Sequence, residues 1–229
     1  MIIHPKFIFV HLPKTGGTFL TKFLSKHIPE SKELKNDVHR PLYYFKKIEK
    51  ITFGFIRNPF DWYISLFSAN THGAGPTRPN RAQWFSHKNV RTDPNIFIDY
   101  LLNKETVNVP LIDFNIMHKL DIGILTYRFL YSFFDHNIFN LKNIPKNFMD
   151  FNLCQNILKF EKGIAEETIK LFKNKKIFID ENNQKILKNS KKVNTSPHQH
   201  YSVYYNQRTY NLIKKKDRII FNLFYRDLL

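Results

Sequence analysis

The stretch that decides the fold is Phe7-Ile8-Phe9-Val10-His11-Leu12-Pro13-Lys14-Thr15-Gly16-Gly17-Thr18-Phe19-Leu20. Its apolar run of aromatic and β-branched residues, which ends at Pro13, is typical of a buried strand, and a helical pattern follows the two glycines. Glycines at such a turn let the backbone bring bare N–H groups close to an anion. The first-turn N–H groups and positive dipole end of the following helix stabilise the same anion. The stretch therefore predicts a phosphate-binding loop, in which Lys14 supplies a charge and Thr15 and Thr18 supply hydroxyl groups.

This loop differs from the phosphate loop of ATPases. In the Walker form, the lysine directly follows the last glycine and a hydroxyl residue stands beside it to bind magnesium. Here Lys14 precedes Gly16 and Gly17, and no glycine lies upstream to begin such a loop. Taken alone, these residues also fit an ordinary strand-to-helix turn with incidental basic residues.

A second stretch repeats the pattern of a strand followed by a helix. Residues Ile51–Ile56 predict a buried strand, which Arg57-Asn58-Pro59 ends. Pro59 suits the first turn of a helix and Asn58 suits its cap. Arg57 follows the strand directly, and Ser65 lies eight residues later in the helix. A guanidinium and a hydroxyl near one strand end suit a second phosphate, whereas a salt bridge and a solvated serine are the structural alternative.

The two motifs together resemble the nucleotide-binding signatures of sulfotransferases, which use 3′-phosphoadenosine 5′-phosphosulfate (PAPS) as donor. They read Pro13-Lys14-Thr15-Gly16-Gly17-Thr18 and Arg57-Asn58-Pro59-x-Asp61-x-x-x-Ser65. A weaker similarity to carbohydrate-type sulfotransferases lies near the C-terminus. It comprises Val193-Asn194-Thr195-Ser196, Tyr201, Tyr204-Tyr205, and a charged helix leading to Asp217 and Phe224-Tyr225. The middle of the chain, from about Thr71 to Asn147, has little that matches.

The resemblance implies a set of donor-binding residues. The 5′-phosphosulfate would bind Lys14, Thr15, Gly16, Gly17, Thr18 and Phe19, the 3′-phosphate would bind Arg57 and Ser65, and Asn194 and Ser196 would lie at the nucleotide. The donor would leave as adenosine 3′,5′-bisphosphate (PAP), and no metal is expected. The implied fold is α/β, a three-layer sandwich with a central, mainly parallel sheet flanked by helices (the P-loop-NTPase-like sulfotransferase fold), in a single domain over residues 1–229. Strands that alternate with helices along the chain indicate the same class.

Transfer to a hydroxyl requires a base that removes the acceptor proton. In heparan-type uronyl sulfotransferases a histidine between the two motifs has this role, and by that resemblance His39 is the base here. An ordinary imidazole, with a pKa of about 6.5, suits the task. Asp37 is the alternative, because some relatives use a carboxylate, and the structural alternative for His39 is a ring that caps a loop or packs on Tyr43. His11 is expected to be a core histidine that bonds to backbone.

Composition limits the possible partners. The chain has 36 basic and 19 acidic residues, a formal net charge of +17, and 42% hydrophobic residues. The hydrophobic content excludes disorder, and the positive charge indicates an anionic partner. We expect an acceptor hydroxyl on an acidic glycan and no nucleic-acid partner. Two other classes remain as alternatives: an ATP- and magnesium-dependent nucleotide or small-molecule kinase, and a basic nucleic-acid-binding module, for which the Tyr201–Tyr210 segment supplies aromatic residues.

The expected compartment is the cytoplasm. The single cysteine, Cys154, excludes an internal disulfide and fits a reducing compartment. No apolar run approaches the ~20 residues of a membrane helix, so no membrane anchor is expected. The absence of H-E-x-x-H and C-x-x-C spacing gives no support to a metal site.

Periodicity predicts the remaining elements less sharply. The expected elements are a strand at Met1–His11, helices at Thr18–Ile28, Ile96–Asn103 and Leu111–Leu120, a helix or buried strand at Gly123–Phe134, a strand at Phe148–Leu153 and a helix from there to about Lys173. The basic, Gly- and Pro-containing stretch Thr71–Pro94 fits an acceptor lid and equally a surface loop.

Overall fold

The computed structural model describes residues 1–34, 37–45, 47–71, 92–103, 112–190 and 199–229. The chain divides into two compact units. The first unit comprises Met1–Arg57, Phe129–Ile138 and Asn147–Asn194, and the second comprises Asn58–Arg128, Phe139–Lys146 and Thr195–Leu229.

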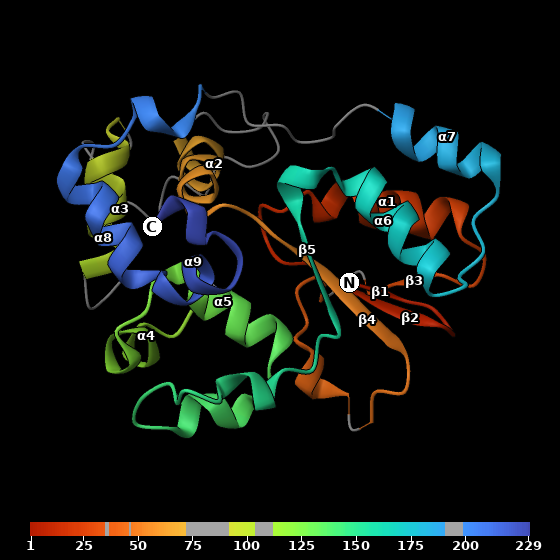
Figure 1. The fold of residues 1–229 in the computed structure, drawn as a ribbon, viewed down its shortest axis with the longest axis horizontal. Coiled ribbons are helices and arrows are strands. Elements are labelled where there is room, and N and C mark those ends of the chain that lie inside the picture. The colour runs from red at the N-terminus through yellow and green to blue at the C-terminus, as the bar shows by residue number, and fades with distance from the viewer. Residues whose placement is uncertain (35–36, 46, 72–91, 104–111, 191–198) are drawn as a thin grey trace. The chain divides into compact units, whose positions relative to one another are not determined.

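The first unit is built on a mixed sheet (Figure 1). Across the sheet the order is β3 (Lys32–Glu33), β1 (Ile2–Ile3), β2 (Phe7–Val10), β4 (Ile51–Ile56) and β5 (Asn156–Lys159). β2, β4 and β5 are parallel neighbours, whereas β1 pairs antiparallel with both β2 and β3. The predicted α/β class is confirmed. The sheet is mixed with a parallel centre, because the chain enters it through a hairpin.

That hairpin divides the strand predicted at Met1–His11. The chain turns between β1 and β2 at Pro5, which has no N–H to donate to a ladder. The turn is closed by the amide of His4, which donates to the Phe7 oxygen at 2.9 Å, and by the amide of Lys6, which donates to His4 Nδ1 at 3.1 Å. The prediction of one continuous strand is therefore wrong, because Ile2–Ile3 and Phe7–Val10 are two strands joined by a turn.

Helices α1 (Gly17–His27), α6 (Ile164–Asn174) and α7 (Glu181–Asn189) share a hydrophobic core with one face of the sheet. Alternate strand residues supply that face, namely Phe7, Phe9, Phe53 and Phe55, and helix residues such as Leu20 and Phe172 pack against them. Each fully buried Phe or Leu side chain stabilises the fold by about 1.5–3 kcal/mol. On the opposite face Phe133 packs against Gly54, where an added Cβ would lie 2.5 Å from the ring. Helical residues therefore cover both faces of the sheet.

The prediction for the segment after Phe148 is wrong as far as Gly163, whereas the helix expected to reach about Lys173 is confirmed from Ile164. Residues Phe148–Phe151 form a short 3-10 helix, and the strand lies later, at β5, where a helix was expected. Thr52 of β4 explains the position of β5. Its hydroxyl donates to the Leu153 oxygen at 3.0 Å and accepts from the Gln155 amide at 2.8 Å, which aligns this segment beside the buried central strand.

The second unit is helical where it is described. It contains α2 (Pro59–Thr71), α3 (Pro94–Asn103), α4 (Phe114–Leu120), the first residues of α5 (Ile124–Phe133), α8 (Gln207–Lys216) and α9 (Arg218–Phe224). Across the described residues of both units, 3-10 turns are found at η1 (Leu42–Tyr44), η4 (His136–Asn140), η5 (Phe148–Phe151), η6 (Phe160–Lys162), η7 (Tyr201–Val203) and η8 (Arg226–Leu228). The predicted helices at 18–28 and 96–103 are confirmed, 111–120 is confirmed from Phe114, and the ambiguous run 123–134 is a helix. Pro59 begins α2, and Asn58 Oδ1 accepts from the Phe60 amide at 3.0 Å.

A buried carboxylate holds the second unit together. Asp217 is fully buried and accepts hydrogen bonds from Tyr63 Oη, the Thr126 amide and Thr126 Oγ1, each at 2.7 Å. Because Thr126 lies in the first turn of α5, Asp217 acts as an N-terminal cap supplied from a distant part of the chain. Burial raises the pKa of this carboxyl to about 6, against the effect of its hydrogen bonds. An added Cβ at Gly123 would lie 2.4 Å from Asp217 Oδ2, so glycine makes room for the carboxylate.

Among the described residues, no helix has the length and apolarity that crossing a membrane would require.

Candidate anion-binding site

The predicted loop lies between β2 and α1 and has an unusual backbone. Lys14 has φ 66° and Gly16 has φ 74°, both in the left-handed region. A non-glycine residue there costs about 1–2 kcal/mol, so neighbouring contacts must hold Lys14 in place. Thr15 is one such contact, because its buried hydroxyl donates to the Leu12 oxygen at 2.8 Å. Alternation of this kind turns successive N–H groups to one side and forms an anion-binding concavity.

The first turn of α1 carries unsatisfied donors. The helix begins after Gly16, which provides no side-chain cap, and its first turn contains no acidic residue. The Phe19 amide donates to the Gly16 oxygen at 3.0 Å, so this predicted donor-binding residue uses its N–H within the turn. Over the described part of the chain, the amides of Gly16, Gly17 and Thr18 have no acceptor.

Other helices of the chain are capped by their own side chains. Asp113 caps α4, Asp180 caps α7 and Asn206 caps α8, with oxygen-to-amide distances of 3.1, 2.8 and 2.8 Å. Helix α6 follows Gly163 without a side-chain cap but has Glu166 and Glu167 in its first turn. The start of α1 has neither a cap nor a carboxylate, which leaves its donors for an external anion.

Arg57 joins the second predicted motif to this loop. It is 9% exposed, and its Nη1 donates to the Lys14 oxygen at 3.1 Å. Its guanidinium lies 4.6 Å from the centre of the Phe160 ring, in a cation–π contact. Phe160 and Ile164 also pack against Gly16, where an added Cβ would lie 3.2 and 2.1 Å from their side chains. Adjacent parallel strands thus bring both motifs to one end of the sheet.

Of the remaining donor-binding predictions, one falls on a described residue. Ser65 is buried on α2, in the second unit, whereas Arg57 belongs to the first unit. Asn194 and Ser196 lie outside the described residues, as does most of the stretch Thr71–Pro94.

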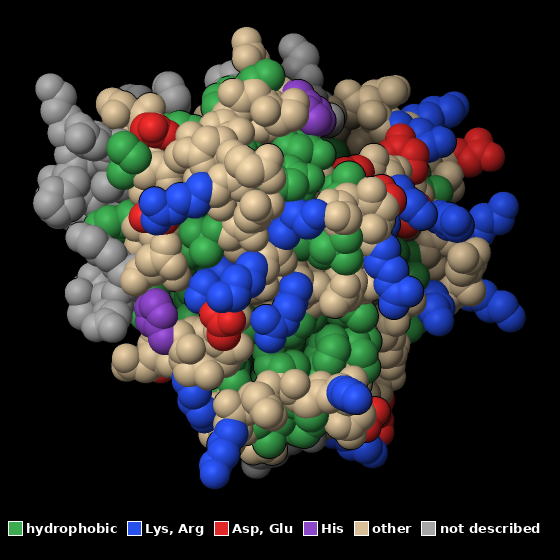
Figure 2. Space-filling view, turned by 60° about the vertical axis from the view of Figure 1, so that its left-hand side comes forward, with side chains coloured by type: hydrophobic (Ala, Val, Ile, Leu, Met, Phe, Trp, Pro, Cys, Tyr) green, Lys and Arg blue, Asp and Glu red, His purple; other side chains and the backbone are tan. Residues whose placement is uncertain are grey.

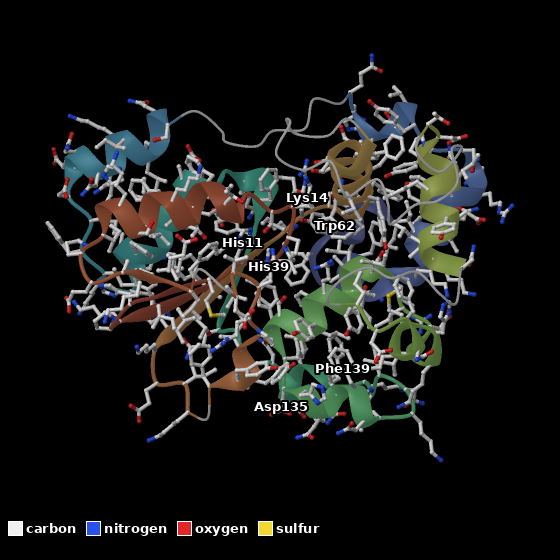
Figure 3. The ribbon with its side chains drawn as sticks, turned by 180° about the vertical axis from the view of Figure 1, so that it is seen from behind. His11, Lys14, His39, Trp62, Asp135 and Phe139 are labelled. Carbon is white, nitrogen blue, oxygen red and sulfur yellow. The ribbon has the colours of Figure 1, made fainter. Side chains whose placement is uncertain are left out.

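His39 belongs to the same end of the sheet. Its Nδ1 lies 2.8 Å from the backbone oxygen of His11, the residue after β2. Because a carbonyl oxygen can only accept, Nδ1 carries the proton of this hydrogen bond. Figure 3 shows His39 near Lys14 and His11. The alternative base, Asp37, instead accepts from Arg40 Nε at 2.8 Å, and this ion pair stabilises its carboxylate.

His11 lies between the loop and His39. It is 8% exposed, and its ring centre is 4.6 Å from that of His39, in an edge-on contact. Burial, reinforced by the charge of His39, holds the pKa of His11 well below its ordinary value. The predicted burial is confirmed. The predicted hydrogen bond from its ring is not found, since Nδ1 has no partner. Sequence reasoning missed the contact with His39, which no local pattern encodes.

The tyrosines named for the nucleic-acid-binding alternative pack against the protein itself. The tyrosines of the Tyr201–Tyr210 segment pack around Phe60, with the ring centres of Tyr201 and Tyr210 at 5.2 and 4.3 Å from its own. They are therefore core contacts. On the face drawn in Figure 2, lysine and arginine side chains are dispersed among hydrophobic and uncharged ones.

No group of three or more metal-ligating side chains gathers in the described part of the chain. Burial raises the pKa of Cys154 to about 12, which makes it a poor nucleophile.

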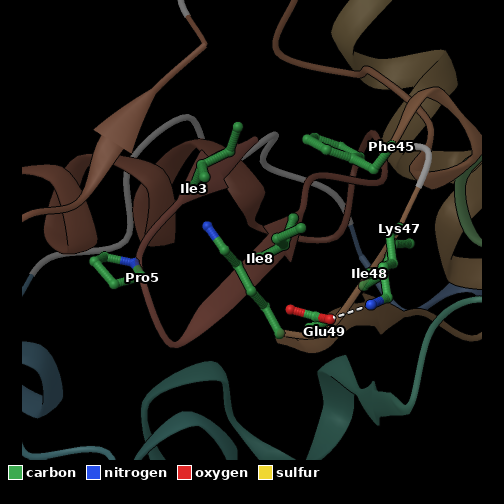
Figure 4. A pocket seen from close by; sticks show the side chains of 8 residues that line it. Ile3, Pro5, Ile8, Phe45, Lys47, Ile48 and Glu49 are labelled. Atoms are coloured by element: carbon green, nitrogen blue, oxygen red, sulfur yellow. Dashed lines mark ion pairs between the residues drawn. The ribbon is translucent and has the colours of Figure 1, made fainter.

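A pocket of about 490 Å³ lies at the amino ends of β2 and β4 (Figure 4). It is lined by Ile3, Pro5, Ile8, Phe45, Lys47, Ile48, Glu49 and Lys50, and the Lys47–Glu49 ion pair spans 2.5 Å. Ligands of open α/β sheets bind beyond the carboxyl ends of the strands. This pocket lies at the other end and is separate from the loop.

No protein-family model, curated protein sequence or solved structure matches this chain.

Proposed function

We propose that this protein is a sulfotransferase that moves the sulfuryl group of PAPS to an acceptor hydroxyl. The observation that supports it best is the start of α1, where three backbone donors beside Lys14 lack an acceptor among the described residues while His39 is held at the same strand end. The first unit, a sheet with helical residues on both faces, is in this proposal the three-layer, P-loop-like fold of that family.

The loop would bind the phosphosulfate end of the donor. The amides of Gly16, Gly17 and Thr18 and the charge of Lys14 suit its oxygens. Lys14 would also stabilise the negative charge that builds on the leaving oxygen. Arg57 holds the Lys14 backbone, and a guanidinium suits the 3′-phosphate, to which Ser65, Asn194 and Ser196 would add. Metal ions are not needed for this role of Lys14.

His39 would act as the base. The acceptor oxygen forms a bond to sulfur as the bond from sulfur to the 5′-phosphate oxygen breaks, and the acceptor proton passes to Nε2 of His39. The products are a sulfate ester, PAP and a protonated His39. The carbonyl of His11 fixes the Nδ1–H tautomer, so Nε2 is the atom that accepts the proton. We propose an acidic glycan as acceptor, because the net charge of +17 favours a polyanion.

Calorimetric titration with PAP, and with ATP in the presence and absence of magnesium, tests the donor site. We expect PAP to bind without metal and to lose affinity in Arg57→Ala, whereas Lys26→Ala, in the last turn of α1, serves as the control. Binding of ATP with magnesium alone would exclude the sulfotransferase and favour a kinase. Salt-sensitive binding of bulk DNA in place of PAP would favour the nucleic-acid-binding class.

A further inference from the structure

We propose that His11 is a positioning residue, which holds the His39 ring and the first turn of α1 in one arrangement. The inference rests on the proposed function in giving His39 a role in transfer. The contacts on which it is based lie within the first unit and hold without a ligand.

His11 contacts His39 in two ways. Its backbone oxygen accepts from His39 Nδ1 at 2.8 Å, and its ring meets the His39 ring edge-on at 4.6 Å, with 61° between the planes. The hydrogen bond requires an orientation of the His39 ring in which Nδ1 faces the His11 oxygen. The edge-on contact with the His11 ring holds that orientation, and with it the Nδ1–H tautomer and the direction in which Nε2 points.

The same ring contacts the anion-binding loop. An added Cβ at Gly17 would lie 1.8 Å from Cδ2 and 2.3 Å from Nε2 of His11, so the ring occupies the space beside the first residue of α1. Gly17 is one of the residues whose amide lacks an acceptor. An anion bound to the Gly17 amide would contact the backbone against which the His11 ring packs. Occupation of the loop is thereby coupled to the orientation of His39.

The burial of His11 argues that its ring positions His39 and does not itself accept a proton. Its Nδ1 is buried without a hydrogen-bond partner, and the residue is 8% exposed. A second proton on this ring would make it a buried cation with no acceptor at Nδ1, at a large desolvation cost. The ring therefore acts through its shape. It follows that phenylalanine, which keeps a ring and lacks the nitrogens, preserves the function, whereas alanine does not.

The experiment records the tautomer of His39 by long-range ¹H–¹⁵N spectroscopy of the full chain labelled in its histidines. Signals are assigned by their loss in His39→Gln. We expect wild type and His11→Phe to show the Nδ1–H form, and His11→Ala to show a mixture of both tautomers. His4→Ala is the matched control, because His4 is also 8% exposed and stacks on Phe7 at 4.5 Å, and it should leave the His39 signals unchanged.

Gly17→Ala provides a second route that leaves His11 in the chain. Its Cβ would displace the His11 ring, and we expect the same tautomer mixture as in His11→Ala. Addition of PAP should shift the His39 signals in wild type and in His11→Phe by more than twice the shift in His11→Ala.

An unchanged tautomer in both His11→Ala and Gly17→Ala overturns the proposal. A mixture in His11→Phe as large as in His11→Ala also overturns it, because the nitrogens would then be required. If PAP fails to bind the wild type, the proposed function fails, while the ligand-free spectra still decide the role of His11.

Discussion

Arg57 donates a hydrogen bond from Nη1 to the backbone oxygen of Lys14 at 3.1 Å, across 43 residues of chain. The residue after β4 thus holds the loop after β2. Because β2 and β4 are parallel neighbours, their carboxyl ends meet, and the two sequence motifs come together without a ligand. Arg57 therefore has a structural role in the loop in addition to the phosphate-binding role proposed for it.

Arg57→Ala should weaken PAP binding by tenfold or more, because the loop loses its anchor together with a phosphate contact; tenfold corresponds to about 1.4 kcal/mol. Phe160→Leu removes the cation–π contact, worth about 0.5–2 kcal/mol, and keeps an apolar side chain beside Gly16, so it should have a smaller effect. Calorimetric titration measures both. Arg208→Ala, an exposed arginine of the second unit, should bind as wild type. Equal affinities in wild type and Arg57→Ala would show that the loop does not depend on this anchor.

Gly16→Ala should abolish PAP binding and destabilise the protein. The left-handed backbone costs about 1–2 kcal/mol with a side chain, and the new Cβ displaces Ile164. Gly163→Ala is the matched control, since its φ of 88° is also left-handed but it lies outside the loop. Denaturant titration should show a loss of stability in both variants, and calorimetry a loss of affinity in Gly16→Ala alone. A comparable loss of affinity in Gly163→Ala would attribute the effect to stability.

His39→Gln should lower turnover by about 10²–10⁴-fold with little change in PAP affinity, because a general base contributes in that range. Transfer of labelled sulfate from PAPS to a desulfated acidic glycan measures it. Asp37→Asn should retain turnover within a few fold, since Asp37 pairs with Arg40. The reverse result, an active His39→Gln and an inactive Asp37→Asn, would assign the base to Asp37.

Asp217 should make stability fall as pH rises. Its pKa is about 6 in the folded protein against 3.8 as the ordinary value, so between these pH values the folded state holds a proton that the unfolded state has lost. The contribution of Asp217 to the free energy of unfolding is fully present below pH 3.8. It falls by roughly 3 kcal/mol as pH rises through 6. Urea unfolding from pH 4 to 7 gives the free energy of unfolding of wild type and of Asp217→Asn. The advantage of wild type over the variant should decline across this window.

Asp121→Asn is the control of opposite sign. A hydrogen bond from Lys216 lowers the pKa of Asp121, so its contribution is present above the ordinary value and is lost as pH falls. If the difference in free energy of unfolding between wild type and Asp217→Asn does not change with pH, the buried carboxyl does not titrate in this range.

Elements that depend on neighbours in the chain could be predicted. The strand Ile51–Ile56 and the start of α2 at Pro59 are confirmed at the predicted residues, because apolar runs, glycine turns and caps act within a few residues. Elements that depend on a distant partner could not. β5 takes its position from Thr52, about a hundred residues away, and the residues before it form a 3-10 helix instead of the predicted strand.

The sequence by itself determined the α/β class, the strand-to-helix turn at Lys14–Thr18 and the residue types suited to an anion there. Only the tertiary structure decided which partners meet at that turn: Arg57 on the Lys14 backbone, His39 on the carbonyl of His11, and the His11 ring against Gly17. The reason is physical. Local backbone preferences act over a few residues and leave a signal in the sequence, whereas contacts across 28 or 43 residues form only when parallel strands bring their carboxyl ends together.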